Sequence, residues 1–315
     1  MASYNHFSND NVALVGSRDI GVFRDGEKVG RIPLGSLRQP NRMRRLYSFG
    51  IISDTHINQS GKPNANWNMG KAADFFESET DVEFVCNCGD LVGDGTDETA
   101  WKAYKVDVDR IGKPVYSIGG NHEQWIFDVV PSFMKDYVGN QSVWFSKVVL
   151  DDVFFFLGTY EYINTSGGVQ RFLRDDVLAI QKLLDDNRNK RCFVFHHVPI
   201  TSEFEYNIFG EYTKGSLPMS LFKHYKNITV FSGHTHSPFS KHMTNKSANV
   251  NRNNGFRAVH VPALCDHCEG YVVDVYEDGI HLRGMNFKTG YIPIASYWVD
   301  TSLVDVSESY TYKGE

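Results

Sequence analysis

The chain has 315 residues, of which 41% are hydrophobic and 22% are charged, as in an ordinary globular protein. This length predicts two domains or one large domain with a sizeable core. The 32 Lys and Arg residues against 38 Asp and Glu give a formal net charge of −6, which argues against nucleic acid as a general partner. No apolar signal-peptide core and no long apolar run is evident, so we expect no membrane contact and a cytoplasmic location.

Residues 1–45 differ in pattern from the rest of the chain. Two strand-like segments, 20–24 and 27–32, flank Asp25-Gly26, a pair typical of a two-residue β-hairpin turn. A passage rich in proline and arginine follows, and it favours a solvated linker over a nucleic-acid patch. We therefore predict a small N-terminal β-hairpin arm and linker over 1–45 and one main domain over 46–315.

From Leu46 onward, strand and helix patterns alternate along the chain. Apolar runs rich in β-branched and aromatic residues predict strands at 46–53, 82–88, 114–118, 143–150, 153–158, 192–195 and 228–232, with a β-rich tail over 256–299. Helical patterns cover 67–79, 99–110, 124–137 and 170–187. A βαβ start followed by β-rich elements predicts an α/β (α+β) fold in which two sheets pack face to face with helices outside.

Several predicted strands end in polar side chains that a core would not tolerate unpaired. Asp54 and His56 follow the first strand of the main domain, and side-chain alternation would point them the same way. Four more strand ends carry such groups, at Gly89-Asp90, Gly119-Gly120-Asn121-His122-Glu123, His196-His197-Val198-Pro199 and Gly233-His234-Thr235-His236. Ligands collect at the carboxyl ends of strands in open α/β sheets. The pooled carboxylates, amide and imidazoles are the mixed set that two divalent transition metals need, with one carboxylate shared.

In these five blocks the chain resembles the calcineurin-like metallophosphoesterases, over roughly residues 46–300. The resemblance implies a four-layer α/β/β/α sandwich of two mixed sheets. It also implies two sets of metal ligands: Asp54, His56 and His236 at one ion, Asn121, His196 and His234 at the other, and Asp90 at both. In the pair His196-His197 we take the first as the ligand, because of its offset to Pro199. The second, His197, would then support the ligands without binding the metal itself. The resemblance places His122 against the substrate without a bond to metal.

The chemistry implied is hydrolysis of a phosphate ester on a small substrate, either a diester or a monoester, by a hydroxide that bridges two ions of Mn, Fe or Zn. Two cations lower the pKa of a shared water and withdraw charge from the phosphoryl oxygens. His122 would protonate the leaving oxygen. Glu123 either orients His122 or is a helix-start carboxylate.

Two other functions fit the same residues. A nuclease on this fold is disfavoured by the acidic balance of the chain. A non-catalytic metal-binding scaffold or interaction protein remains because a fold does not fix a function, although a complete ligand set with His122 argues against it. The native metals, the mono- or diester preference and the oligomeric state are left open by these patterns.

A CxxC segment and two aromatic segments are further candidates for functional sites. Cys265-Asp266-His267-Cys268 has the spacing of half a zinc site, but no second CxxC accompanies it. The other three cysteines lie in apolar runs and are read as reduced core residues. Aromatic residues in 202–216 and in 160–162 are candidate walls of a substrate site, with packing of these loops onto the domain as the alternative.

Overall fold

The computed structural model describes residues 11–14, 19–24, 27–33, 44–163, 169–199, 205–209, 222, 224–239, 250–251 and 256–301. The chain divides into two units, Met1–Arg44 and Arg45–Glu315. Within the described ranges, each helix is too short or too polar to cross a membrane.

The N-terminal unit contains a three-stranded antiparallel sheet in the order β1-β2-β3. Its strands are β1 (Asn11–Leu14), β2 (Asp19–Arg24) and β3 (Glu27–Pro33). Arg24 pairs with Glu27 across the β2–β3 connection, so the two predicted hairpin strands are present. The turn residues Asp25 and Gly26 lie outside the described residues.

The first large sheet of the main unit has the strand order β18-β17-β16-β4-β5-β6. Its strands are β4 (Arg45–Ile52), β5 (Phe84–Asn87), β6 (Val115–Ser117), β16 (Glu269–Tyr276), β17 (Gly279–Asn286) and β18 (Gly290–Asp300). Strands β4, β5 and β6 are parallel, whereas β16, β17 and β18 form an antiparallel meander that joins β4. The sheet is therefore mixed, and its parallel half comes from the N-terminal part of the main unit.

The second large sheet has the order β14-β15-β13-β11-β8-β7. Its strands are β7 (Trp144–Val149), β8 (Asp152–Leu157), β11 (Cys192–His196), β13 (Ile228–Ser232), β14 (Val250–Asn251) and β15 (Arg257–His260). The four central strands are parallel, and the two edge strands are antiparallel to their neighbours. Strands β8, β11 and β13 are buried along their whole length, as expected for strands covered on both faces.

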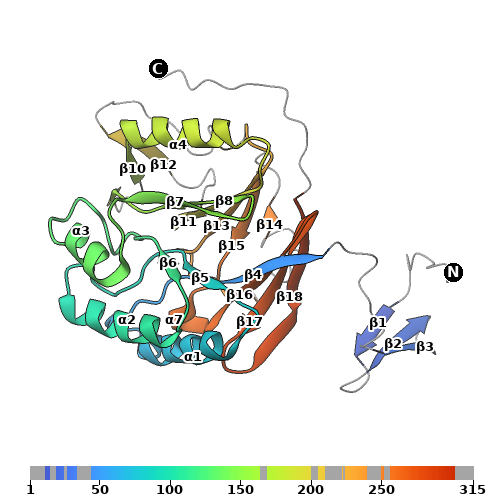
Figure 1. Cartoon of the computed structure of the whole chain (residues 1–315). Coiled ribbons are helices and arrows are strands. Elements are labelled where there is room, and N and C mark those ends of the chain that lie inside the picture. The colour runs from blue at the N-terminus through green and yellow to red at the C-terminus, as the bar shows by residue number, and fades with distance from the viewer. Residues whose placement is uncertain are drawn as a thin grey trace. The chain divides into compact units, whose positions relative to one another are not determined.

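In the main unit the two large sheets lie between outer helices (Figure 1). Three clusters of apolar side chains hold these layers together. Phe49 of the first sheet meets Phe154 and Phe193 of the second, with ring centroids 5.3 and 5.5 Å apart. Helices α1 (Ala65–Ser78) and α2 (Glu98–Arg110) cover the outer face of the first sheet, and α4 (Arg174–Asp186) covers the outer face of the second. The predicted fold of two mixed sheets packed face to face, with helices outside, is confirmed.

The predicted helix over 124–137 is shorter than expected. Its first residues are not helical because Trp125 N–H and Ile126 N–H donate to the carbonyls of Thr159 and Tyr160 (3.1 and 3.0 Å). The helical part begins only at α3 (Val130–Phe133), which has Pro131 in its first turn, and continues as a π-helical turn, η2 (Met134–Val138). Proline is favoured in a first turn because its missing N–H has no helical partner there.

A third, small sheet was not predicted. It has the order β12-β10-β9, with β9 (Glu161–Ile163), β10 (Val169–Leu173) and β12 (Glu205–Phe209). The predicted helix over 170–187 therefore starts later, at α4, after the strand β10. The remainder of the predicted aromatic loop 202–216 lies outside the described residues.

A buried polar network joins the two large sheets at the amino ends of β4 and β8. Tyr47 Oη donates to Asp152 Oδ2 (2.5 Å), and Arg191 donates to both Asp152 oxygens (3.0 and 2.6 Å). Arg191 also donates to the carbonyl of Tyr276 (2.6 Å) in the first sheet. Arg191 lies beyond the end of α4 and is only 7% exposed, so its guanidinium serves this network.

Candidate metal centre

The carboxyl ends of β4, β5, β11 and β13 bring most of the predicted ligands together. Backbone hydrogen bonds join Asp54 N–H to Gly89 O (2.9 Å) and His56 N–H to Asp90 O (3.0 Å), so the first two strand ends continue side by side as loops. Gly233 N–H donates to His197 O (3.0 Å) and joins two more strand ends in the same way.

Five residues at these strand ends have a left-handed backbone. The φ angles lie between 46° and 68° for Asp54, His56, Asp90, His234 and His236. Such angles are uncommon for residues other than glycine and cost about 1–3 kcal/mol each. The surrounding fold must therefore impose these angles. Strain at five residues in neighbouring loops marks these loops as a candidate functional site.

Glycine at two positions allows the loops to approach one another closely. A Cβ atom at Gly120 would overlap the carboxylate of Asp90, and one at Gly233 would overlap the side chains of Ser53 and Asp54. Larger residues at 120 or 233 would therefore push the carboxylates out of their present positions.

A first group of donor atoms consists of Asp54, His56, Asp90 and His236, within 4.8 Å of one another. His56 Nε2 lies 2.9 Å from His236 Nε2 and 3.5 Å from Asp90 Oδ2. His236 Nε2 lies 3.2 Å from Asp54 Oδ1. Asp54, His56 and Asp90 are at most 2% exposed, whereas the His236 side chain is 26% exposed, so the group opens to solvent on the side of His236.

A second group shares Asp90 with the first and adds His197 and His234. His197 Nε2 lies 3.1 Å from Asp90 Oδ2 and 3.1 Å from Asn121 Oδ1. His234 Nδ1 lies 2.8 Å from the same Asn121 oxygen. Asp90 therefore stands between two clusters, as the sequence suggested for a shared carboxylate.

The structure brings His197, and not the predicted His196, into this second group. His196 is the last residue of β11, and its Nδ1 donates to Leu157 O of β8 (2.9 Å). Along β11, Phe193 and Phe195 face the space between the sheets, while Cys192 and Val194 face α4. His196 continues the second series and His197 the first, which is why the second histidine reaches Asp90. The alternation of side chains along β11, and not the offset to Pro199, therefore decides which histidine reaches Asp90.

Hydrogen bonds determine which ring nitrogen of His197 and of His236 carries the proton and which one has a free lone pair. His197 Nδ1 lies 2.9 Å from Cys88 O, and His236 Nδ1 lies 2.7 Å from Asp266 Oδ2, so both Nδ1 atoms carry protons. In the neutral rings the Nε2 lone pairs then face carboxylates. Acceptors that face acceptors in a buried site repel unless a cation lies between them. The donor set of nitrogen and oxygen atoms fits divalent transition ions.

The electrostatic field of the two carboxylates also attracts cations. Burial alone would lower the pKa of His197, but the charge and hydrogen bond of Asp90, together with the charge of Asp54, outweigh burial and raise it to about 9. Burial is likewise outweighed at His236, where Asp54 raises the pKa to about 9. A field that holds a proton on these nitrogens will hold a metal ion in competition with it, because ligand imidazoles must be deprotonated.

His122 lies beside both groups without belonging to either. Its backbone N–H donates to Asp90 Oδ1 (3.0 Å), and its Nδ1 donates to Gly93 O (2.7 Å). Its Nε2 is 3.9 Å from Asp90 Oδ2, and the side chain is 26% exposed. The Nε2 edge of His122 is thus held next to the shared carboxylate and remains accessible to solvent.

Glu123 has a different position from either of the two expected. Its Oε1 accepts from Val92 N–H and its Oε2 from Gly120 N–H, both at 2.9 Å. Burial and the nearby charge of Asp90 raise the pKa of Glu123 to about 7. The residue therefore ties together the two loops that carry Asp90 and Asn121, and it neither starts a helix nor touches the His122 ring.

Tyr162 borders the second group. Its ring centroid lies 5.6 Å from that of His234, and its backbone N–H donates to Gln124 Oε1 (2.7 Å). Burial and then the charge of Asp90 raise the pKa of its phenol. Of the two aromatic segments suggested as substrate walls, the one at 160–162 thus reaches the candidate site.

The CxxC segment does not unite its two thiols. Cys265 Sγ lies 3.8 Å from His236 Nδ1, while Cys268 Sγ donates to the carbonyl of Asn68 (3.7 Å). In the described part of the chain, no candidate metal group contains both. The suggestion of half a zinc site is therefore not supported.

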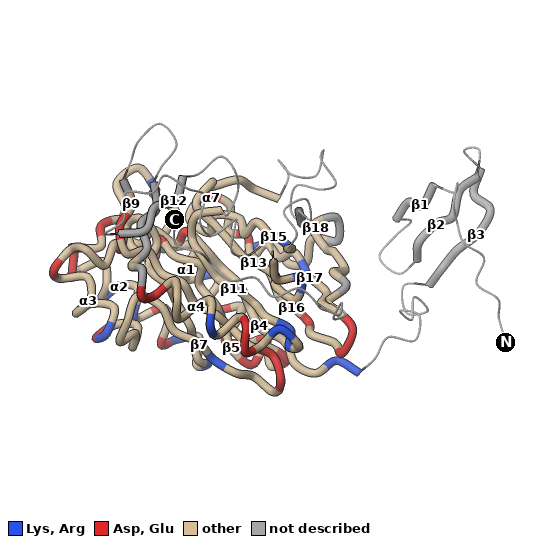
Figure 2. Tube along the Cα trace, turned by 90° about the horizontal axis from the view of Figure 1, so that it is seen from above, with Lys and Arg blue, Asp and Glu red and all other residues tan. Residues whose placement is uncertain are grey.

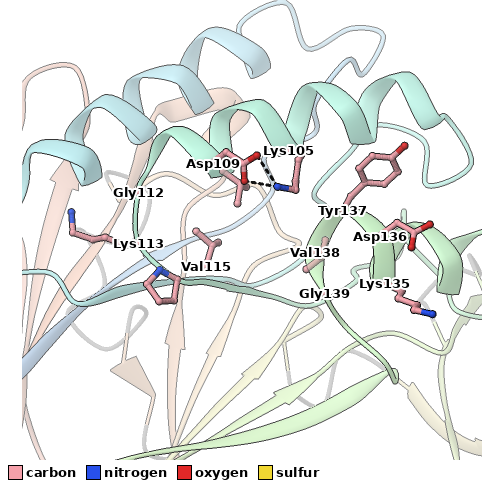
Figure 3. Close-up of a pocket in the computed structure, with 12 residues that line it drawn as sticks. Lys105, Asp109, Gly112, Lys113, Val115, Lys135, Asp136, Tyr137, Val138 and Gly139 are labelled. Atoms are coloured by element: carbon pink, nitrogen blue, oxygen red, sulfur yellow. Dashed lines mark hydrogen bonds and ion pairs between the residues drawn. The ribbon is translucent and has the colours of Figure 1, made fainter.

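A separate hollow lies at the other end of the parallel strands (Figure 3). It encloses about 500 Å³ between α2, η2 and the amino end of β6, and its lining includes Lys105, Asp109, Lys113 and Lys135. The candidate ligands follow the carboxyl ends of the strands, so this hollow is not part of the metal centre.

Comparison with protein families agrees with this arrangement. The family model described as calcineurin-like phosphoesterase matches residues 47–238, which is more than half of the chain. The chain belongs to the calcineurin-like phosphoesterase family. The match extends from β4 to the loop that carries His234 and His236, and so it covers both donor groups of this phosphoesterase domain.

A solved structure shows the same fold. The chain is similar to purple acid phosphatase PPD1 from the seeds of yellow lupin (Lupinus luteus), with a TM-score of 0.58 and 14% identity over 94% of this chain. The chain spans 62% of the length of that protein. The protein TT1561 of Thermus thermophilus is matched at a TM-score of 0.48 and 10% identity, over 81% of this chain and 99% of that one. A comparison with curated proteins gave no significant match.

Proposed function

We propose that this calcineurin-like phosphoesterase binds two divalent transition-metal ions and hydrolyses a phosphate ester of a small substrate. One ion would be held by Asp54, His56 and His236, the other by Asn121, His197 and His234, and both by Asp90. The observation that carries the proposal is the position of the Asp90 carboxylate, whose Oδ2 lies 3.5 Å from His56 Nε2 and 3.1 Å from His197 Nε2. A carboxylate between two such groups is suited to a two-metal site.

When bound, the two ions would activate a water molecule as the nucleophile and stabilise charge on the phosphoryl oxygens. The chain's own contribution is position and proton transfer. His122 is held by Gly93 O and Asp90, with Nε2 directed to the side of the shared carboxylate. A protonated His122 can therefore donate to the leaving oxygen, a role suited to an imidazole near neutral pH.

The surface charge supports a small substrate rather than a nucleic acid. Figure 2 shows that the positions of Lys and Arg are interspersed with those of Asp and Glu along the described part of the main unit. Tight binding to a polyanion needs several cationic contacts along its backbone. The substrate screen described below tests whether the enzyme prefers phosphodiesters or phosphomonoesters. A cytoplasmic location stays a prediction.

The decisive experiment combines metal analysis with a substrate screen. Metal-stripped protein is loaded with Mn²⁺, and turnover is measured on phosphomonoesters, cyclic nucleotides, phospholipid headgroups and short nucleic acids. We expect up to two ions per chain and turnover on a small ester that a chelator abolishes. Protein that binds no metal at any loading, yet retains turnover, would contradict the proposal. Metal binding with no turnover on any phosphate ester would favour the scaffold alternative.

The role of His122 has its own test. General acid catalysis contributes about 10²–10⁴-fold, and its benefit shrinks as the leaving group becomes more acidic. We expect His122→Ala to slow alkyl or nucleoside esters by about this factor and a nitrophenyl ester much less, with metal content unchanged. Equal losses across a series of leaving groups would remove the acid role, and loss of metal would make His122 a structural residue.

A further inference from the structure

The segment Leu264–His267, which forms the short helix α7, is attached directly to the end of β4. Leu264 N–H and Cys265 N–H donate to the carbonyls of Ser53 and Asp54 (2.9 and 3.0 Å). On its other side, Asn68 Nδ2 of α1 donates to the carbonyls of Leu264 and Cys265, both at 2.8 Å. These bonds fix the segment relative to the strand end that carries Asp54.

Three side chains of α7 and its surroundings contact His236. Asp266 Oδ2 accepts from His236 Nδ1 at 2.7 Å. Lys62 Nζ lies 2.8 and 2.6 Å from the two oxygens of Asp266, and 3.1 Å from His236 Nδ1. His267 Nε2 donates to the backbone carbonyl of His236 (3.0 Å). The ring of His236 is thus held from the side opposite to Asp54 and His56.

We propose that Asp266, held in place by Lys62, is a positioning residue that determines the affinity of the metal site containing His236. The inference rests on the proposed metal-dependent function. It assigns a role to the Cys265–Cys268 segment that its spacing did not suggest: the segment supplies a carboxylate to a ligand histidine.

The physical argument starts from the two nitrogens of one imidazole. Because Asp266 accepts a hydrogen bond from Nδ1–H of His236, the neutral ring presents its Nε2 lone pair to the side of Asp54 and His56. A carboxylate on the far nitrogen makes the near nitrogen a stronger donor and limits rotation of the ring. Partners of this kind change metal affinity by about 10–100-fold when they are removed.

Lys62 gives the carboxylate a single orientation. With both oxygens of Asp266 bonded to one ammonium group, only a small rotation remains available to the carboxylate. The side chains of Lys62 and Asp266 are 24% and 28% exposed, so the pair is partly screened by water and its effect should be smaller than that of Asp266 itself.

The test is a Mn²⁺ titration of the metal-stripped full-length chain against a competing chelator. We expect wild type to bind two ions, and Asp266→Ala to bind one of them about 10–100-fold more weakly while the other is unchanged. Lys62→Met should weaken the same ion by a smaller factor. In the double variant Lys62→Met should add nothing further, because Lys62 acts through Asp266. Asp266→Asn keeps an acceptor of the same shape, and its affinity should fall between wild type and Asp266→Ala.

The chain offers a matched control pair. Lys105 Nζ contacts both oxygens of Asp109 (2.5 and 2.7 Å) on α2, beside the hollow at the far end of the strands (Figure 3). Asp109→Ala and Lys105→Met should leave both affinities unchanged. Cys265→Ser should do the same, and an equal loss in that variant would overturn the assignment to the carboxylate.

Two further outcomes separate this inference from the function on which it rests. Wild type that binds no Mn²⁺ would refute the proposed function. Wild type with two ions, together with Asp266→Ala of unchanged affinity at both sites, would refute only the inference. Equal weakening of both ions would also refute it, since a general structural loss would act on the whole centre.

Discussion

Two aspartates are almost fully buried at opposite ends of the same sandwich, and their surroundings differ. Asp152 is 6% exposed and accepts hydrogen bonds from Tyr47 and from the guanidinium of Arg191. Asp90 is 2% exposed and lies near His56, His197 and His122. Within the described residues, no Lys or Arg forms an ion pair with Asp90 or with its neighbour Asp54.

The difference separates a structural cluster from a functional one. The chain itself supplies the cation for Asp152, and burial together with the charge of this carboxylate raises the pKa of Tyr47, so the phenol stays a donor. The cluster around Asp90 has a strained backbone, and its positive charge comes from His197 and His236, whose pKa values the carboxylates raise to about 9. A metal ion can replace those protons, whereas it cannot replace the guanidinium beside Asp152. Burial alone does not distinguish the two aspartates; the nature of the cation beside each one does.

The largest effect should come from Asp90→Asn. It removes the charge shared by both metal groups, and we expect turnover to fall by about 10⁴-fold, or about 5 kcal/mol of transition-state stabilisation. The metal-free fold should be retained, because the amide has nearly the same shape as the carboxylate that it replaces. Turnover and elemental analysis check this. An Asp90→Asn protein with two ions and normal turnover would break the comparison.

The corresponding substitution in the buried network at the opposite end of the sandwich is Asp152→Ala. It leaves Arg191 buried without its carboxylate, and loss of one partner of a buried ion pair costs about 3–5 kcal/mol. We expect the free energy of unfolding in denaturant to fall by this amount, while turnover per folded molecule stays near that of wild type. A variant of normal stability but reduced turnover would show that the two ends are coupled.

Added metal should stabilise the folded protein through the cluster around Asp90 and not through the cluster around Asp152. A ligand at 100 times its Kd stabilises the folded state by about 2.7 kcal/mol. We expect Mn²⁺ to raise the melting temperature of wild type and of Asp152→Ala alike, and to have little effect on Asp90→Asn. Metal-free buffer with chelator serves as the reference. Equal stabilisation of Asp90→Asn would mean that the ions bind elsewhere.

The smallest effect should follow removal of the N-terminal unit. All the residues assigned to the two metal groups belong to the main unit, so a truncation that begins at Arg44 should retain most turnover on a small chromogenic ester. A folded, metal-loaded truncation without turnover would place the N-terminal arm in the site. Circular dichroism and metal content provide the controls for folding.

Much of the fold was readable from the sequence because periodicity reports burial directly. Strands β8, β11 and β13 are continuous apolar runs, and each was predicted close to its observed bounds. The miss at residues 124–129 has a long-range cause, since the N–H groups of Trp125 and Ile126 bond to the carbonyls of Thr159 and Tyr160 instead of forming a helical turn. Such a bond depends on a partner far along the chain and leaves no local pattern.

In the candidate site, too, some residues were predictable from local sequence and others depended on contacts between distant parts of the chain. Glycines and polar residues after buried strands marked Asp54, Asp90 and His236. The choice between His196 and His197 depended on which side of β11 faces the other sheet. Asp266 is 30 residues from His236 in the chain, and the two meet only because α7 attaches to the end of β4.

The left-handed backbone at five of the proposed ligands has a consequence for protein design. A designer who copied these side chains onto the ends of ideal strands would point them in the wrong directions, because idealised backbones avoid positive φ at residues other than glycine. The turns between strand and loop must be built first, together with the glycines at 120 and 233 that let them approach. A two-metal centre of this kind is therefore transferred as a set of loops rather than as a list of ligands.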